Sequence, residues 1–381
     1  MVFKNLVFQG GGFAGVAYVG AIKKLESLEQ EGKFSFKQLE RVAGTSVGAL
    51  TAMLVALGYT ADEIYEKTLA LSLDSLKSGG CGIIGNLVRL NKNYGIYHPD
   101  NLLKFIRECI EEKTGNKNAT FGDFKKMGFK DLYVVATKVY LRDTQSTCKA
   151  VSFSHENAFD TPVAEAVLAS ACFPGLFGCV RLEEVRPGFY KMTQSNKANA
   201  YIDGGLLDNL PEELFDQTRY IENEKEKKVE TILNPETLSL LLVDKITLDE
   251  ITENKTIDAP LPLGAPIAYL SALVNGCTLD QQNNLLRKNQ GANRSIFIDR
   301  LGVSTIANLD ATTKKKLIAS GDLAVAKFFG VAPTPAQTAS SIAEEFAKKR
   351  AYPGFLQRKP LAPQSIETAP KTHQPKACTI L

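Results

Sequence analysis

The sequence predicts an α/β protein with a mostly parallel, doubly wound sheet and helices on both faces of it. A short apolar segment, residues 6–8, leads through three glycines into a stretch whose apolar residues recur at helical spacing up to Leu28. The same order recurs from residues 41–43 through a second glycine loop to an apolar helix expected at 49–57. Repeated strand, loop and helix units are typical of parallel strands joined by crossover helices.

The remaining elements continue this alternation over longer connections. Pro99 suits the first turn of a helix over 100–113, and further helices are expected at 163–170, 265–288, 312–329 and 340–351. Strands are expected at 132–136, 150–153, 201–202, 238–243 and 295–298. The glycine-rich segment 71–97 interrupts the pattern and has two interpretations, a mobile flap and a merely flexible loop.

The chain divides into three parts on this reading. Residues 1–245 hold the glycine loops and most of the expected strands, and form the core. Residues 246–351 are expected to be a helical extension that packs on the core or completes it. Residues 352–381 contain five prolines and are expected to be a disordered tail. Residues 348–381 are also basic, because seven Lys or Arg stand there against one Glu.

Composition excludes several classes of protein. The 45 Lys and Arg nearly balance the 42 Asp and Glu, and a net charge of +3 argues against nucleic acid as a partner. Seven cysteines without a CxxC pair and only three histidines predict no metal site and no disulfide framework. The N-terminus lacks the apolar stretch of a signal peptide, and the weakly polar run 261–275 is too short for a bilayer, which needs about 20 residues. We expect a soluble protein of a reducing compartment.

The first glycine loop has two interpretations. Gly10, Gly12 and Gly15 fit the GxGxxG pattern of dinucleotide-binding loops. That interpretation also requires an acidic residue at the end of the second strand, to bind the ribose. The second strand instead ends in Val42, Ala43 and Gly44, without a carboxylate. The dinucleotide interpretation therefore lacks its supporting residue.

The second glycine loop has the pattern of a nucleophile elbow. Gly44-Thr45-Ser46-Val47-Gly48 stands between a strand and a helix, where small neighbours let a serine hydroxyl project from a tight turn. The helix N-terminus would also stabilise negative charge that develops beside Ser46. The alternative is an ordinary tight turn with Ser46 as an N-cap residue.

A nucleophilic Ser46 needs a base, and the histidines are poor candidates. His98 precedes a helix, His155 lies in an expected turn, and His373 lies in the tail. The base is therefore expected to be a carboxylate. Asp203 is the best candidate, because it follows a strand end and precedes two glycines, at the sheet edge where both glycine loops should lie. Its alternative role is that of an Asx-turn residue.

The combination of these motifs resembles the patatin-like phospholipases. Their pattern is a glycine-rich loop, a GxSxG elbow and a D-G-[GA] motif on a three-layer α/β/α fold. This chain has Gly10-Gly11-Gly12, the Ser46 elbow and Asp203-Gly204-Gly205 in that order, and two accessory features of the family, residues 169–177 and Asn209 with Pro211. The resemblance covers about residues 4–245.

The resemblance implies a lipid acyl hydrolase of the phospholipase A or lysophospholipase type. Ser46 would attack the ester of a phospholipid or lysophospholipid, and Asp203 would accept its proton and later activate water. Backbone N–H groups of Gly10, Gly11 and Gly12 would form the oxyanion hole. No cofactor or metal is implied. Ala14 departs from the family, which usually has a basic residue there; the departure puts efficiency in doubt, not the chemistry.

The last four residues match a prenylation signal. Cys378-Thr379-Ile380-Leu381 has the C-a-a-X form, and the final Leu favours a geranylgeranyl group. One lipid chain anchors weakly, and the basic tail would supply the second signal for a membrane surface. We expect a cytoplasmic, peripheral membrane protein in a eukaryotic cell, either a native one or a bacterial effector delivered there. An activating host protein is a further candidate partner, and a solubilising tail is the alternative role of this segment.

Two other functions fit the same motifs. One is a catalytically silent membrane adaptor that keeps the fold and binds a lipid or a partner. The other is an acyltransferase that passes the acyl group to an alcohol instead of water.

Overall fold

The computed structural model describes residues 2–76, 90, 94–142, 144–221, 232–244, 272–281, 284 and 294–334. All of them belong to one compact unit, residues 1–338. The expected helix 340–351, the proline-rich tail and Cys378 lie outside the described residues, as do most of the expected flap and residues 245–271. The boundaries at 245 and 351 stay predictions.

The main sheet of the described chain has nine strands. Their order is β11-β10-β1-β2-β4-β9-β7-β8, and β5 pairs separately with β4. The strands are β1 (Asn5–Phe8), β2 (Arg41–Thr45), β4 (Asp131–Arg142), β5 (Gln145–Phe153), β7 (Val180–Arg186), β8 (Phe189–Met192), β9 (Asn199–Asp203), β10 (Thr237–Val243) and β11 (Ser295–Asp299). Two short strands, β3 (Gly95–Tyr97) and β6 (Gly175–Phe177), form a separate parallel pair.

The α-helices of the described residues include five at or near predicted positions and three, at 61–70, 73–76 and 121–126, that were not expected. They are α1 (Ala17–Gln30), α2 (Val47–Ala56), α3 (Ala61–Ala70), α4 (Leu73–Leu76), α6 (Asp100–Thr114), α7 (Phe121–Lys126), α8 (Val163–Ala171) and α11 (Ala311–Phe328). Single 3-10 turns are η1 (Gly12–Val16), η2 (Phe36–Gln38), η3 (Gly204–Leu206), η4 (Pro211–Phe215) and η5 (Thr218–Tyr220). Residues 272–281, within the helix expected at 265–288, are helical too.

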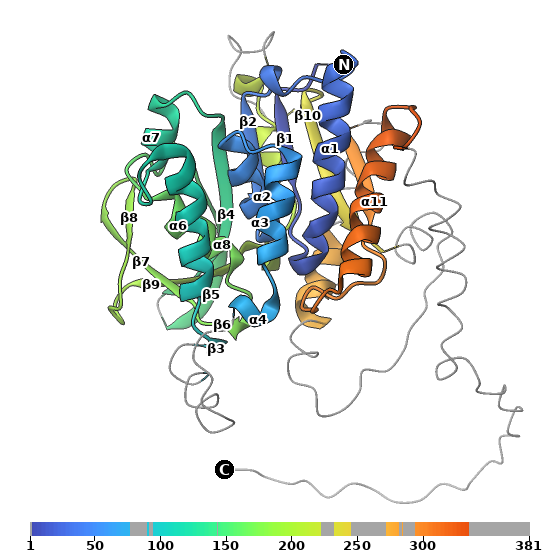
Figure 1. Cartoon of the computed structure of the whole chain (residues 1–381). Helices are drawn as coiled ribbons and strands as arrows, with labels where there is room; N and C mark the ends of the chain where they lie inside the picture. The colour runs from blue at the N-terminus through green and yellow to red at the C-terminus, as the bar shows by residue number, and fades with distance from the viewer. Residues whose placement is uncertain are drawn as a thin grey trace, which may run out of the picture. The chain divides into compact units, whose positions relative to one another are not determined.

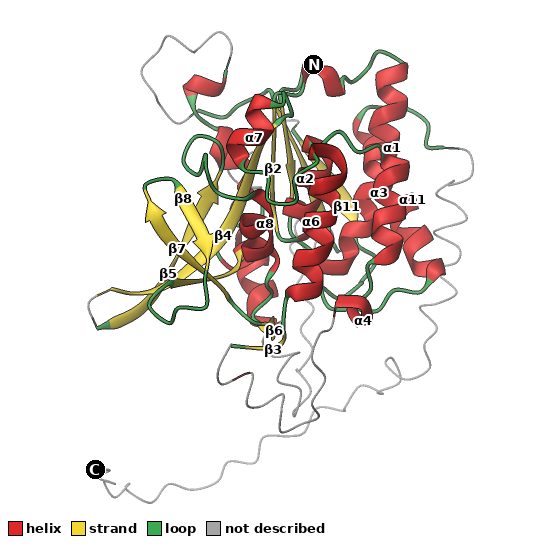
Figure 2. Ribbon diagram, turned by 60° about the vertical axis from the view of Figure 1, so that its left-hand side comes forward, coloured by secondary structure: helices red, strands yellow, loops and turns green. Residues whose placement is uncertain are grey.

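The sheet is parallel in one half and antiparallel in the other. Strands β11, β10, β1, β2 and β4 pair parallel with one another in this order, which confirms the predicted parallel sheet there. Strands β5, β9, β7 and β8 pair antiparallel, and Figure 2 shows β5, β7 and β8 on the left, beside the helices. Short connections permit antiparallel pairing, whereas parallel neighbours need a crossover.

Successive side chains along each strand point to opposite faces of the sheet and form two apolar layers. Leu6 and Phe8 of β1 join the cluster formed with α1, α2, α6, α8 and α11, which contains most of the core. Val7 faces the other way, into a smaller cluster with Leu210 and Phe215 beside η4 and η5. Helical segments therefore cover both faces of the sheet, as the sequence predicts for strands buried on both sides.

Strand β1 lies at the point where the strand order reverses. The chain passes from β1 through α1 to β2 on one side, whereas β10 lies on the other side of β1 and leads to β11 at the sheet edge (Figure 1). Crossovers in the two directions leave a crevice at the carboxyl ends of the strands, which is where open α/β sheets bind ligands. The first glycine loop follows β1 at this crevice.

Candidate active site

Ser46 lies at the sharp turn between β2 and α2. Its backbone has φ 58° and ψ −127°, an unusual conformation for a residue with a side chain. Two glycines make the turn possible. A Cβ on Gly44 would lie 2.2 Å from the carbonyl oxygen of Gly48, and one on Gly48 would lie 2.3 Å from the carbonyl oxygen of Phe8. The tight strand-to-helix turn expected at Ser46 is therefore present, with glycine required by close packing.

Asp203 reaches Ser46 by a route that the sequence argument did not foresee. Thr45 at the end of β2 pairs with Val135 of β4, and Asp203 at the end of β9 pairs with the next residue, Ala136. Both β4 residues pair with β5 on the opposite side, so β2 and β9 share one side of β4. Strand β9 is antiparallel to β4, and it meets β2 end to end.

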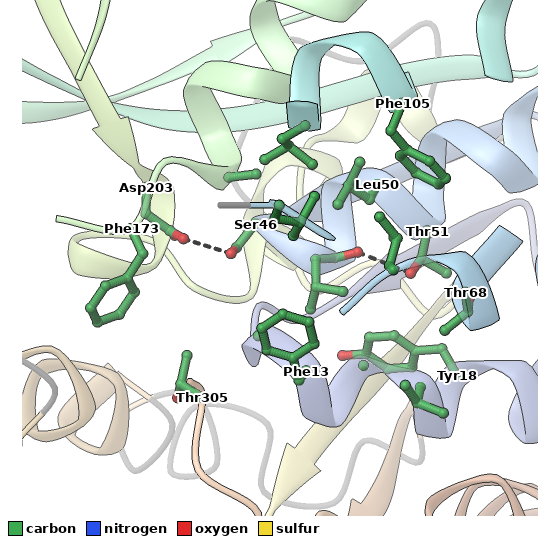
Figure 3. A pocket seen from close by; sticks show the side chains of 18 of the residues that line it. Phe13, Tyr18, Ser46, Leu50, Thr51, Thr68, Phe105, Phe173, Asp203 and Thr305 are labelled. Carbon is green, nitrogen blue, oxygen red and sulfur yellow. Dashed lines mark hydrogen bonds between the residues drawn. The ribbon is translucent and has the colours of Figure 1, made fainter. Parts of the chain in front are cut away.

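This geometry corrects the reason given for Asp203. From the sequence, Asp203 was expected at the carboxyl edge of a parallel sheet, beside the glycine loops. That reason is wrong, because β9 runs antiparallel to β4. The two side chains nevertheless meet. Ser46 Oγ donates a hydrogen bond of 2.6 Å to Asp203 Oδ2, as Figure 3 shows.

The carboxylate of Asp203 is held in a buried position. The backbone N–H of Gly205 donates to Oδ1 at 2.8 Å, and the residue is only 5% exposed. Burial raises the pKa of Asp203 to about 6, while the hydrogen bonds from Ser46 and Gly205 act in the opposite direction. A carboxylate with this pKa is ionised near neutral pH and is a stronger base than an exposed aspartate.

Ser170 forms hydrogen bonds that hold the strained turn at Ser46 in place. Its Oγ accepts the backbone N–H of Ser46 at 2.9 Å and donates to the carbonyl of Val135 at 2.5 Å. Ser170 itself is fully buried in α8. Ser170 belongs to the accessory motif 169–177, but no sequence pattern indicates its role. Only the fold shows that its hydroxyl links the turn at Ser46 to β4.

The first glycine loop lies against the elbow. A Cβ on Gly10 would approach the Cβ of Ser46 to 3.2 Å. The N–H of Gly10 donates to the carbonyl of Asn209 at 3.0 Å, so this amide anchors the loop and is already occupied. In the described part of the chain, the amides of Gly11 and Gly12 have no hydrogen-bond acceptor. Ala14 is fully buried in η1.

An apolar cavity leads away from the Ser46 hydroxyl. It encloses about 1000 Å³, including the open space at its mouth, between η1, α1, α2, α3 and α6. Among the described residues that line it, Asp203 alone is charged; the others include Phe13, Val47, Leu50, Leu54, Ile64, Leu71, Leu76, Leu102, Phe105, Leu176 and Phe177. Figure 3 shows Leu50 and Phe105 beyond Ser46 on this side. The cavity fits a hydrocarbon chain.

A second cavity opens on the other side of the same hydroxyl. It encloses about 700 Å³, including open space, and Ser46, Asp203, Gly10 and Gly11 line it. Its other lining residues are more polar and include Asn209, Asp244, Asn275, Thr278 and Arg300. Ser46 therefore lies between an apolar cavity and a polar one.

The C-terminal segment contributes to both cavities, which the sequence analysis missed. Thr305 lines both of them, and its carbonyl accepts the N–H of Phe13 at 3.2 Å. Gln281 contacts the loop after β9 directly: its Oε1 accepts the N–H of Asn209 at 2.8 Å, and its Nε2 donates to the carbonyl of Leu206 at 3.1 Å. No motif marks these residues, because their role comes only from packing.

Several other groups lie apart from this site. Neither His98 nor His155 lines either cavity. Within the described ranges, no group of three or more His, Cys, Asp and Glu is placed to hold a metal ion. No helix among the described residues is both long and apolar enough to cross a membrane.

The sheet topology and the site define a class of α/β proteins that present a serine to a buried aspartate at a strand-to-helix turn. Comparison with known families identifies the family to which this α/β chain belongs. Residues 6–216, more than half of the chain, match the family model described as patatin-like phospholipase. The chain belongs to this family.

Similar proteins come from viruses and bacteria. An uncharacterized protein of Acanthamoeba polyphaga mimivirus is 29% identical over 56% of this chain, which spans 61% of that protein's length. A probable lipid hydrolase of Invertebrate iridescent virus 6 is 27% identical over 62% of this chain and 70% of its own length. The crystal structure of VipD from Legionella pneumophila aligns over 87% of this chain and 67% of its own, with a TM-score of 0.47 and 17% identity.

Proposed function

We propose that this protein is a lipid acyl hydrolase that uses Ser46 as nucleophile and Asp203 as base. The observation that carries the proposal is the 2.6 Å hydrogen bond between the two side chains, at the junction of an apolar and a polar cavity. Membership of the patatin-like phospholipase family and the similarity to a probable lipid hydrolase support it. The substrate class we propose is a phospholipid or lysophospholipid.

The first half of the reaction forms an acyl-enzyme. Ser46 Oγ attacks the ester carbonyl carbon while its proton passes to Asp203 Oδ2, which already accepts it in a hydrogen bond. The carbonyl oxygen becomes an oxyanion and receives hydrogen bonds from the free amides of Gly11 and Gly12. Each such donor contributes about 3 kcal/mol to the stability of the transition state. The bond to the alcohol oxygen then breaks, and this oxygen takes the proton from Asp203.

The second half releases the fatty acid. Asp203, ionised again, accepts a proton from a water molecule as that water attacks the acyl carbon of Ser46. Collapse of the second tetrahedral intermediate returns the proton to Ser46 Oγ. The raised pKa of Asp203 suits both roles, because proton transfer is efficient when the base has a pKa near the working pH.

The two cavities divide the substrate between them. The acyl chain occupies the cavity between α1, α2 and α6, where each buried methylene contributes about 0.8 kcal/mol. The alcohol part occupies the polar cavity beside Asn209 and Asn275. Recruitment to a membrane surface through a prenylated Cys378, and dependence on an activating host protein, remain part of the proposal.

The test is fatty-acid release from phospholipid vesicles, with eukaryotic cytosolic extract added to supply any activator. Ser46→Ala and Asp203→Asn should each lower release at least about a thousandfold. Asp208→Asn is the matched control, because Asp208 lies in the same loop, half-buried, and no hydrogen bond joins its carboxylate to Ser46 in the described structure. It should retain most activity.

A fluorophosphonate probe tests the alternatives. The wild-type protein should react at Ser46, whereas a silent adaptor would leave it unlabelled. A wild-type protein that is neither labelled nor more active than Ser46→Ala would refute the hydrolase proposal. Acyl transfer would instead give a new ester once an alcohol is added.

A further inference from the structure

The carboxyl ends of β10 and β11 carry an ion pair at the polar cavity. Asp244 follows β10 and Arg300 follows β11, and the backbone N–H of Arg300 continues the pairing by donating to Val243. Arg300 Nε lies 2.9 Å from Asp244 Oδ2. The side chains are only 20% and 29% exposed, and both residues line the cavity that contains Ser46.

The terminal nitrogens of Arg300 are available to a ligand. Arg300 Nε and Asp244 Oδ1 are both buried and have no hydrogen-bond partner among the described residues, so the contact between the two side chains is an ion pair without an aligned hydrogen bond. Neither terminal guanidinium nitrogen has a hydrogen-bond acceptor among the described residues. The ion pair holds the Nε side of the Arg300 guanidinium against Asp244 and leaves its outer edge, with both terminal nitrogens, without an acceptor among the described residues. This edge carries donors in a planar arrangement that matches two oxygens of a phosphate.

The strand order places this ion pair at a useful distance from the nucleophile. Strands β11, β10, β1 and β2 are consecutive neighbours, and their carboxyl ends carry Arg300, Asp244, the glycine loop and Ser46. Three strand spacings of about 4.8 Å separate β11 from β2, about 14 Å in all. The arginine side chain spans part of this gap, and the glycerol unit of a lipid, with its ester at one end and its phosphate at the other, spans the rest.

We propose that Arg300, held by Asp244, binds the phosphate of the phospholipid whose ester Ser46 attacks. The inference rests on the proposed hydrolase function and adds the residue that selects the head group. The apolar cavity offers no cation among its described lining residues, so a charged head group can be satisfied only on the polar side. A neutral acylglycerol would leave the free edge of Arg300 without a partner.

The experiment compares two substrates with the same acyl chain, lysophosphatidylcholine and monoacylglycerol. Arg300→Gln should lower kcat/KM for lysophosphatidylcholine by about 10- to 100-fold, the loss expected for a charge-assisted hydrogen bond in a partly buried site. It should change kcat/KM for monoacylglycerol by less than about twofold. The kcat/KM of Arg300→Lys for lysophosphatidylcholine should lie between those of the wild type and Arg300→Gln, because lysine keeps the positive charge but lacks the planar pair of N–H donors of the guanidinium.

Two further variants separate recognition from folding. Arg300→Gln leaves Asp244 without its cation, so the double variant Asp244→Asn, Arg300→Gln removes both charges and should show the same selective loss. Arg186→Gln is the matched control, because Arg186 pairs with Asp160 at 2.7 Å on the surface of β7 and lines neither cavity. Equal losses on the two substrates, or no loss in either Arg300 variant, would overturn the proposal.

A binding measurement keeps this inference separate from the hydrolase proposal. In the Ser46→Ala background, calorimetry with lysophosphatidylcholine below its micelle concentration should show binding that Arg300→Gln weakens, whereas binding of monoacylglycerol should stay the same. If the wild-type protein, with cytosolic extract added, releases fatty acid neither from diacyl phospholipid nor from lysophosphatidylcholine, the hydrolase proposal fails, while the binding result still decides the role of Arg300. Equal affinity of both lipids for both proteins would refute it.

Discussion

The buried carboxylate of Asp203 makes activity depend on pH in a defined way. Burial raises the pKa of Asp203 from 3.8 to about 6, and the proposed reaction needs the ionised form to accept the Ser46 proton. At about pH 5, one unit below this value, roughly a tenth of the molecules hold an ionised Asp203. The plot of kcat/KM against pH should therefore fall about tenfold per unit below pH 6 and level off above pH 7.

The same ionisation of Asp203 lowers the stability of the folded protein as the pH rises, whereas it increases the expected activity. Between about pH 4 and pH 6 the aspartate is ionised in the unfolded chain but still protonated in the folded one, so the folded state loses stability as the pH rises. A shift from 3.8 to about 6 corresponds to about 3 kcal/mol. Asp203→Asn cannot ionise and should not show this loss. As the pH rises from about 4 to about 6, the unfolding free energy of Asp203→Asn should therefore increase by about 3 kcal/mol relative to that of the wild type.

The assay for activity is hydrolysis of a soluble fluorogenic ester between about pH 4 and pH 9, and the assay for stability is urea unfolding at the same pH values. Asp208→Asn is the control, because burial raises the pKa of Asp208 to about 7 and this group could produce a similar profile. The profile should persist in this variant. An activity midpoint near pH 4, or a stability difference that does not change with pH, would refute the reasoning.

Three other perturbations test the site and the tail. Leu50→Phe should shorten the apolar cavity and reduce kcat/KM for long acyl chains relative to short ones by about fourfold per excluded methylene; an unchanged chain-length profile would contradict the acyl assignment. Ser170→Ala leaves the buried N–H of Ser46 without its acceptor and should lower the unfolding free energy by about 1–3 kcal/mol, seen as a lower Tm; wild-type stability would show that Ser170 does not support the elbow. Cys378→Ser should move the protein from the membrane fraction to the cytosolic fraction of eukaryotic cells, whereas Cys148→Ser, at an exposed cysteine, should not; unchanged partitioning of Cys378→Ser would rule out prenylation.

Local sequence predicted the parts of the site whose form depends on a few neighbouring residues. The turn at Ser46 is recognisable because Gly44 and Gly48 are needed where backbone approaches backbone within a single strand-to-helix turn. Helix α1 and strands β1, β2 and β10 are recognisable because apolar periodicity reports burial over a short window. These features need no knowledge of distant residues.

Long-range pairing decided what the local patterns could not. Asp203 meets Ser46 because β9 and β2 share one side of β4, and neither short motif encodes this pairing between distant strands. Arg300 reaches the polar cavity because β11 joins the sheet beyond β10, and Gln281, from the helical residues 272–281, hydrogen-bonds to the loop after β9. Their side chains have no distinctive spacing, so their roles follow only from the folded arrangement.

The sequence by itself determined the strand-to-helix turn that presents Ser46, its glycine neighbours and the α/β class, since each is encoded in contacts between residues close along the chain. Only the tertiary structure decided the end-to-end meeting of two strands, the brace at Ser170 and the separation of an apolar cavity from a polar one. The physical reason is that these features arise from non-local strand pairing and side-chain packing, which depend on the whole fold.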